Sequence, residues 1–293
     1  MDRWQDLEPY LPGLLFRLME EAGKVIRGFD DELSEVRIGR EVTFLSLPAR
    51  QIPLPCPLGE EGLQGILLRF CHGAVYACRE GLEDGFVCPG GGIRVGIGGR
   101  YVRGGGIRDL NCLTVRIPHE VPGAGREAVR AFGEGQGMLI FSPPGGGKTT
   151  LLRDFIATLA GPPRYLPVAV ADARGELSGT LPHGANLCLT EGLDKATAIS
   201  MALRHAAPRC LVCDEIGGAD VTEAILESAV CGVPLVATTH AGSVQELYRR
   251  PSLSALLRAG VFPVLLSLEK GPGGPVCRRC GTEVAECVLS ACC

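Results

Sequence analysis

Aromatic residues and clusters of basic residues are scarce in this chain of 293 residues. Phenylalanine, tyrosine and tryptophan together make up 5% of the sequence, and the formal net charge is −4. A protein whose main work is to hold nucleic acid presents a basic surface, and it commonly stacks single strands on aromatic rings. The composition therefore disfavours direct binding of nucleic acid as the main activity.

Long apolar segments are missing as well. A helix that crosses a membrane needs about 20 consecutive apolar residues. The longest candidate, residues 261–268, is far shorter, and the charged residues 1–6 lack the apolar core of a signal peptide. We therefore expect a cytoplasmic protein that reaches a membrane only through partners. The hydrophobic content of 46% is enough for a sizeable core in one large domain or two.

The most informative motif is the octet at residues 142–149, Ser-Pro-Pro-Gly-Gly-Gly-Lys-Thr. It follows an apolar run at 137–141 that predicts a buried strand, and it precedes a periodic segment at 150–159 that predicts a helix. A strand, a glycine-rich turn and a helix in this order are typical of a loop that binds the phosphates of ATP. The usual pattern begins with glycine, so Ser142 predicts a slightly strained turn.

The residues of the turn have predicted roles in binding ATP. The glycines let successive main-chain N–H groups face the phosphates, and the helix N-terminus adds partial positive charge. Lys148 is expected to reach the β and γ phosphates, and Thr149 is expected to place its hydroxyl on Mg²⁺. The predicted nucleotide-binding residues of this segment are Pro144, Gly145, Gly146, Gly147, Lys148, Thr149 and Thr150.

An acid pair follows a second apolar run, at residues 210–213. Such a run predicts a buried strand whose carboxyl end faces the ligand crevice. Asp214 would hold Mg²⁺, directly or through water, and Glu215 would orient or activate the attacking water. The alternative is a strand that ends in solvent with charged residues. The pair favours hydrolysis of ATP over the other reactions of phosphate-binding loops.

Two more apolar runs are predicted to end at the same edge of the sheet. The run at 166–171 is followed by Asp172 and Glu176, and a carboxylate there could help to position water. The run that begins at residue 234 ends in Thr239 and His240, either of which could sense the γ phosphate through a hydrogen bond. A histidine at a strand end is otherwise a common surface residue.

These segments together resemble the stage III sporulation protein AA family, a relative of the type II and type IV secretion ATPases in the RecA-like P-loop class. The family usually has glycine where Ser142 stands and an acid where Ala173 stands. Asp172 and Glu176 remain the candidates near Ala173, and we rank Glu215 above both as the residue whose loss stops hydrolysis. The resemblance covers about residues 35–274 and rests on the segments at 94–100, 107–110, 113–117, 143–154, 172–176, 212–217, 238–240, 250–253 and 259–262.

The resemblance implies an ATP-hydrolysing motor subunit that uses ATP and Mg²⁺ and forms a homo-oligomeric, hexameric ring. Hydrolysis would power assembly of, or transport through, a sporulation channel between mother cell and forespore. The implied partners are membrane proteins of that channel, and the implied location is the mother-cell cytoplasm, peripheral to the membrane complex. In relatives, arginines of the N-terminal domain reach the nucleotide, so Arg94, Arg100 and Arg116 are candidates. The alternative is that they pair with nearby carboxylates.

The chain is expected to divide near residues 118–126, where prolines and glycines interrupt the apolar pattern. Residues 1–120 predict a small α+β domain, and residues 121–270 predict an α/β RecA-like ATPase domain with a mainly parallel sheet. Residues 271–293 predict a cysteine-rich tail. The expected elements are helices near 11–19, 63–76, 149, 192, 220 and 244, and strands near 35–39, 93, 137, 166, 209, 234 and 262.

Fourteen cysteines are many for such a chain, but some of them, such as Cys213 and Cys231, fall in runs that look buried. In a reducing cytoplasm they are expected to be free thiols. Cys277 and Cys280 have the spacing of zinc ligands, with Cys287, Cys292 and Cys293 as irregular partners. A tail of reduced thiols is the favoured interpretation.

Two other classes of function compete with an ATPase motor. A nucleic-acid translocase or helicase of the RecA-like class predicts a basic channel that contains aromatic residues, and its ATP turnover should rise with single-stranded DNA. A small-molecule kinase predicts a lid over its substrate and no acid that activates water. Release of phosphate from ATP and water alone would count against the kinase.

Overall fold

The computed structural model describes residues 4–280 except 49, 75–77, 79–80, 83–84, 91–92, 103–105, 118–120, 134, 174, 178–180, 183 and 272–273. The chain forms two compact units, Met1–His119 and Glu120–Cys293. The division falls within the linker predicted at 118–126. Within the described ranges, no helix combines the length and the apolar character that a membrane crossing requires.

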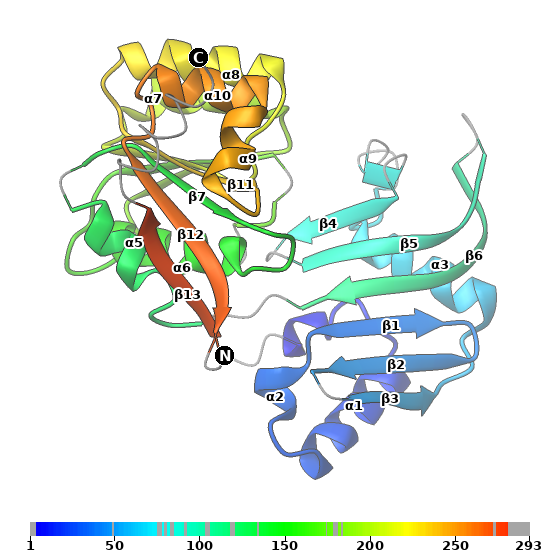
Figure 1. The fold of residues 1–293 in the computed structure, drawn as a ribbon. Coiled ribbons are helices and arrows are strands. Elements are labelled where there is room, and N and C mark those ends of the chain that lie inside the picture. Colours follow the sequence, from blue (N-terminus) through cyan, green and yellow to red (C-terminus); the bar gives the residue numbers. More distant parts are fainter. Residues whose placement is uncertain are drawn as a thin grey trace. The chain divides into compact units, whose positions relative to one another are not determined.

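The first unit is built on a six-stranded antiparallel sheet in the order β3-β2-β1-β6-β5-β4 (Figure 1). Its helices are η1 (Gln5–Leu7), α1 (Gly13–Val25), α2 (Phe29–Glu32) and α3 (Gly59–Phe70). Its strands are β1 (Glu35–Gly39), β2 (Val42–Leu47), β3 (Arg50–Pro55), β4 (Phe86–Gly90), β5 (Ile93–Val102) and β6 (Gly106–Arg116).

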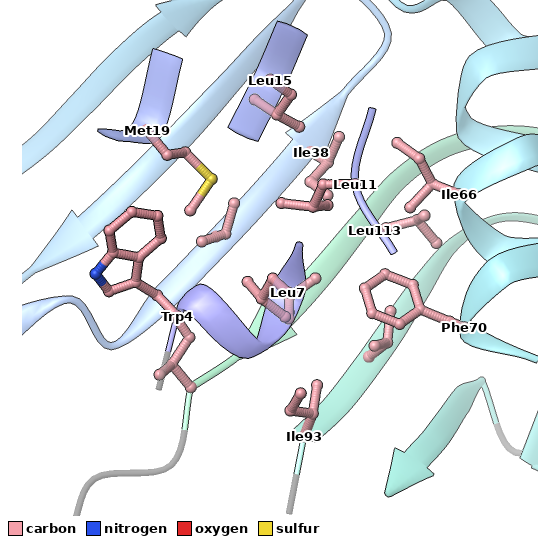
Figure 2. Close-up of a cluster of buried hydrophobic side chains, with 14 of the residues drawn as sticks. Trp4, Leu7, Leu11, Leu15, Met19, Ile38, Ile66, Phe70, Ile93 and Leu113 are labelled. Atoms are coloured by element: carbon pink, nitrogen blue, oxygen red, sulfur yellow. The ribbon is translucent and has the colours of Figure 1, made fainter. Parts of the chain in front are cut away.

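An apolar core lies between one face of this sheet and the helices. Alternate residues of the strands, such as Ile38, Ile93 and Leu113, are buried, as expected for strands with one covered face. Figure 2 shows these side chains gathered with Leu15 of α1 and Phe70 of α3. Helices near 11–19 and 63–76 and strands from 35 and 93 are present as expected, although α3 ends at Phe70. The strands β2, β3, β4 and β6 were not among the expected strands.

The second unit contains a seven-stranded sheet in the order β13-β12-β7-β11-β10-β8-β9. All its pairs are parallel except β12 with β13, so the predicted fold class is confirmed. The strands are β7 (Met138–Ser142), β8 (Val168–Asp172), β9 (Leu187–Glu191), β10 (Cys210–Cys213), β11 (Leu235–His240), β12 (Val264–Gly271) and β13 (Gly274–Cys280). The helices are α5 (Arg126–Ala131), α6 (Lys148–Ala160), α7 (Lys195–Ala206), α8 (Ala219–Val230), α9 (Val244–Arg249) and α10 (Pro251–Arg258).

Helices cover both faces of this sheet (Figure 1). Along β7, Met138 and Ile140 pack with α5 and α6, whereas Leu139 and Phe141 pack with the layer of α7 to α10. Because both faces are covered, the central strands are continuously apolar, which is why they were readable from the sequence. The carboxyl ends of these strands all point to one edge of the sheet.

The chain after residue 270 differs from the predicted tail. Residues from Gly274 to Cys280 form β13, which extends the sheet along β12. Cys277 packs on the α5 and α6 side and Cys280 packs on the opposite side, because three positions along a strand reverse the face. These two thiols are therefore badly placed to bind one metal ion together. Cys287, Cys292 and Cys293 lie outside the described residues.

Two cysteines expected in buried runs differ in their surroundings. Cys213 is fully buried at the end of β10, and burial raises the pKa of its thiol to about 12. Cys231 follows the last turn of α8 and is exposed, so the expectation of burial was wrong for this residue. The helix ends one residue earlier, and the apolar run continues into a turn rather than into the core.

Candidate functional site

Four strands bring the predicted residues to one edge of the parallel sheet. His240 at the end of β11 lies opposite Ser142 at the end of β7. Cys213 of β10 lies between Ala171 of β8 and Ala237 of β11, so Asp214 follows next to the ends of both neighbouring strands. The carboxyl ends of parallel strands are where open α/β sheets bind ligands.

The turn between β7 and α6 depends on glycine at three positions. Gly145 and Gly147 have φ angles of 70° and 89°, which residues with a Cβ rarely adopt. At Gly146 the constraint is space, since an added Cβ would lie 2.2 Å from the Ser142 Oγ. Gly147 caps α6, whose first residue is Lys148, so the amide groups of the turn and the helix N-terminus converge.

Ser142 does not strain the turn, contrary to the expectation from the sequence. It is the last residue of β7, in extended conformation, so glycine is not required there. Its hydroxyl donates to the Pro143 carbonyl at 2.9 Å and accepts a hydrogen bond from the Lys148 ammonium at 3.2 Å. The serine thereby adds a polar contact to the lysine of the motif.

Lys148 lies at the centre of the site and is 6% exposed. Its Nζ donates to the Ser142 carbonyl at 3.3 Å and contacts Nδ1 of His240 at 2.9 Å. Burial lowers the pKa of Lys148, while the negative charges of Asp214 and Glu215 oppose that shift. A lysine ammonium only donates, so His240 accepts at Nδ1 and carries its proton on Nε2.

Asp214 joins the phosphate-binding loop to the end of β11. Its Oδ2 accepts a hydrogen bond from the Thr149 hydroxyl at 2.9 Å, and its Oδ1 accepts one from the Thr238 hydroxyl. The two residues predicted to hold Mg²⁺ are therefore in direct contact. Hydroxyl and carboxylate oxygens are the hard ligands that Mg²⁺ prefers, so the residues present fit this ion.

Glu215 has an unusual backbone conformation for a residue with a side chain. Its φ is 52°, in the left-handed region, and its main-chain N–H donates to the Thr238 hydroxyl at 2.8 Å. Its Oε1 lies 3.4 Å from Nε2 of His240. A conformation of this kind costs about 1 to 3 kcal/mol and persists where the surroundings hold it, often at functional sites.

Of the two residues proposed to sense the γ phosphate, His240 has the more suitable contacts. The Thr239 hydroxyl is buried and donates to the Ile216 carbonyl at 3.2 Å. His240 instead links Lys148 to Glu215 through its two ring nitrogens. The geometry favours His240 for contact with a ligand at this edge.

Asp172 and Glu176 shape the loop after β8. Asp172 is 3% exposed, and its two carboxylate oxygens accept hydrogen bonds from the main-chain N–H groups of Glu176 at 2.9 Å and Leu177 at 2.7 Å. The Glu176 carbonyl accepts from Nε of Arg153 at 3.0 Å. The Asp172 carboxylate thus stabilises the conformation of this loop. Its contact with the nucleotide, and a catalytic part for Glu176, stay predictions.

A pocket of about 670 Å³ opens beside Glu215 and His240 and is also lined by Lys195 and Arg250. The Lys195 ammonium donates to the main-chain carbonyls of Asp214 and Glu215, at 2.6 Å for Glu215. The Arg250 guanidinium donates to the His240 carbonyl at 2.7 Å. Neither contact was predicted, because both are made to main-chain oxygens, which no side-chain motif marks.

The three arginines predicted in the first unit have different surroundings. Arg94 and Arg116 are neighbours across β5 and β6 and line a pocket of about 410 Å³. The Arg94 guanidinium lies 4.1 Å from the centre of the Phe86 ring. Arg100 pairs with Asp109 at 3.3 Å on the surface, which is the local pairing kept as an alternative. Contact of these arginines with a nucleotide stays a prediction.

The parallel sheet, the glycine-rich loop before α6 and the acid pair after β10 define a RecA-like P-loop fold. The ATPase DotB of Legionella pneumophila is similar over 97% of this chain and 85% of its own, with a TM-score of 0.65 and 17% identity. The pilus retraction motor PilT, solved with bound ADP, is similar over 93% of this chain and 86% of its own, with a TM-score of 0.61 and 15% identity.

The chain belongs to the stage III sporulation protein AA family, whose model matches residues 33–278. Stage III sporulation protein AA of Bacillus subtilis (strain 168) is 34% identical over an alignment of 226 residues that covers 71% of this chain and 73% of that protein. Protein SEEDLING PLASTID DEVELOPMENT 1 of Arabidopsis thaliana is 31% identical over 54% of this chain, but only 24% of that protein is covered. The resemblance expected from the motifs is confirmed.

Proposed function

We propose that this protein hydrolyses ATP to ADP and phosphate as a ring-forming motor subunit. One observation carries the proposal: Lys148, His240 and Glu215 form a connected chain beside the contact between Thr149 and Asp214. This series of contacts connects Lys148, a cation that can bind phosphate, with Glu215, a carboxylate that can accept a proton from water. Polar networks that only stabilise a fold occur anywhere in a protein, whereas this network is centred on the phosphate-binding loop, which favours a catalytic role.

The residues divide the work of an in-line attack of water on the γ phosphorus. Lys148 and the main-chain N–H groups of residues 145–149 hold the β and γ phosphates and stabilise the charge that develops on them. Thr149 and Asp214 would hold Mg²⁺, which would neutralise phosphate charge. Glu215 orients the water and accepts its proton while the bond to the leaving ADP oxygen breaks.

His240 would connect the state of the γ phosphate to Glu215. Lys148 has its hydrogen bonds with Ser142 and His240, so ATP would exchange these contacts for phosphate oxygens. His240 is then released from the lysine, and its Nδ1 is able to contact the γ phosphate, whose oxygens accept hydrogen bonds, while its Nε2 still faces Glu215. Thr150, Pro144 and the loop glycines complete the predicted cradle.

The motor role rests on family membership and on the shared fold. We propose a hexameric ring in which hydrolysis drives rigid-body motion of one unit against the other. Its output would be assembly of, or transport through, a sporulation channel between mother cell and forespore. The protein would act in the mother-cell cytoplasm, bound peripherally to membrane proteins of that channel.

The test measures phosphate release from ATP as a function of protein concentration. We expect turnover per subunit to rise with concentration as rings form, and we expect Lys148→Ala to weaken nucleotide binding by about tenfold to a hundredfold, as loss of a charged hydrogen bond does. Lys24→Ala, which removes an exposed lysine, is the matched control. Equal activity in the parent and Lys148→Ala would refute the site.

A further inference from the structure

Lys195 begins α7 at a position that disfavours a lysine. The helix is capped by the Asp194 side chain, which accepts from the Thr197 N–H at 3.0 Å, and its first turn contains no acid. The N-terminus of a helix carries partial positive charge, so a cation there is unfavourable. A residue that breaks a local rule in this way is commonly held by a contact elsewhere in the fold.

The contact that holds Lys195 is with the main chain around Glu215. Its ammonium donates to the carbonyl of Asp214 and, at 2.6 Å, to the carbonyl of Glu215. These two carbonyls belong to the peptide planes on either side of the Glu215 Cα. In extended backbone such carbonyls point in opposite directions, and they point the same way only when the residue between them is helical, right-handed or left-handed.

The left-handed conformation of Glu215 is thus held from two sides. Lys195 donates to both carbonyls, and the Thr238 hydroxyl accepts a hydrogen bond from the Glu215 N–H at 2.8 Å. The φ of 52° sets the direction of the Cα–Cβ bond and therefore of the carboxylate, whose Oε1 lies 3.4 Å from Nε2 of His240. A return of Glu215 to extended backbone would turn its carboxylate away from His240 and Lys148.

We propose that Lys195 is a positioning residue that holds Glu215 in the left-handed conformation needed for attack on ATP. The proposal rests on the proposed ATPase function for its effect on turnover, but not for its effect on the backbone of Glu215. Lys195 acts through main-chain oxygens, so it does not contribute to binding the phosphates. Its loss should therefore lower kcat and leave nucleotide affinity unchanged.

The experiment compares Lys195→Met, which keeps the length of the side chain without the charge, with Arg204→Met, which removes a cation from the last turn of the same helix. We expect Lys195→Met to lower kcat by about a hundredfold, the effect of misplacing a reacting group by about 1 Å. The Kd of a fluorescent ADP analogue should change by less than about twofold, and Arg204→Met should behave as the parent. In Lys195→Ala, ethylammonium chloride should restore part of kcat, and sodium chloride at equal ionic strength should not.

A crystal structure of Lys195→Met tests the proposal independently of activity. We expect Glu215 to lose its positive φ, and retention of that φ would overturn the proposal. Unchanged kcat in a folded Lys195→Met would overturn it as well. If that variant does not fold, Lys195→Gln, which keeps one donor, is measured in the same ways. A parent protein without turnover would refute the ATPase function, and the crystal structure would still decide the role of Lys195.

Discussion

The Thr238 hydroxyl makes the two hydrogen bonds that organise the acid pair, and its removal should be costly. Thr238 is fully buried, donates to the Asp214 carboxylate and accepts from the Glu215 N–H. Thr238→Val keeps the shape of the side chain and removes both bonds. A hydrogen bond to a charged group contributes about 1.5 to 3 kcal/mol, and an N–H left unpaired costs about 1 to 3 kcal/mol. Asp214 is half-buried, so its carboxylate regains some hydration in the variant, and we expect the free energy of unfolding to fall by about 2 to 4 kcal/mol.

The same substitution in the first unit should have the opposite effect. The Thr43 hydroxyl is buried in the core of the sheet and, within the described residues, has no hydrogen-bond partner. Thr43→Val removes an unsatisfied polar group, so we expect it to stabilise the first unit by about 1 to 2 kcal/mol. Trp4 is the single tryptophan and is buried in this unit, so its fluorescence in urea reports the change.

Calorimetry measures the effect in the second unit. A loss of about 2 to 4 kcal/mol lowers the Tm of a unit of this size by about 4 to 16 °C. Phosphate release should fall in Thr238→Val as well, because Glu215 loses one of its two main-chain restraints. A change of stability in the same direction for both substitutions would contradict this prediction, because hydrogen bonding of the hydroxyl would then not determine whether its removal stabilises or destabilises the fold.

Two further predictions concern the phosphate-binding loop. Gly146→Ala should abolish nucleotide binding because its Cβ would lie 2.2 Å from the Ser142 Oγ, and adding Ser142→Gly should restore part of the affinity measured by titration with the ADP analogue. Lys148→Met should raise the free energy of unfolding at pH 7, because burial lowers the pKa of Lys148 and the folded state disfavours its charge. A lysine with a lowered pKa in the folded state binds fewer protons there than when unfolded, so the free energy of unfolding of the parent should rise with pH above that lowered pKa. The difference in stability between the parent and Lys148→Met should therefore shrink toward pH 10.5. A constant difference across urea titrations at several pH values would contradict this.

The parts of the fold that were readable from the sequence are those whose pattern is local. The strands β7, β8, β10 and β11 are buried on both faces, so each is a short apolar run followed by polar residues at the site. The edge strand β9 is partly exposed and lacks such a run. The strand β13 carries two arginines and a proline and depends on pairing with β12, so its sequence does not distinguish it from a tail.

The candidate site could likewise be predicted only where its residues belong to local motifs. Lys148, Thr149, Asp214 and His240 come from motifs, and the structure brings them together. Lys195 acts on main-chain oxygens some 20 residues away, which no side-chain pattern encodes. Its only signal is a lysine at a helix N-terminus, and that signal needs the helix boundary to be known.

Glu215 is proposed to activate the attacking water, whereas binding of ATP does not depend on its carboxylate. The direct measurement is phosphate release and ATP affinity in Glu215→Gln, with Glu223→Gln, an exposed acid of α8, as the control. We predict that Glu215→Gln binds ATP as the parent does and releases phosphate about a hundredfold to ten-thousandfold more slowly, the range for loss of a general base. Parental turnover in Glu215→Gln would contradict the account.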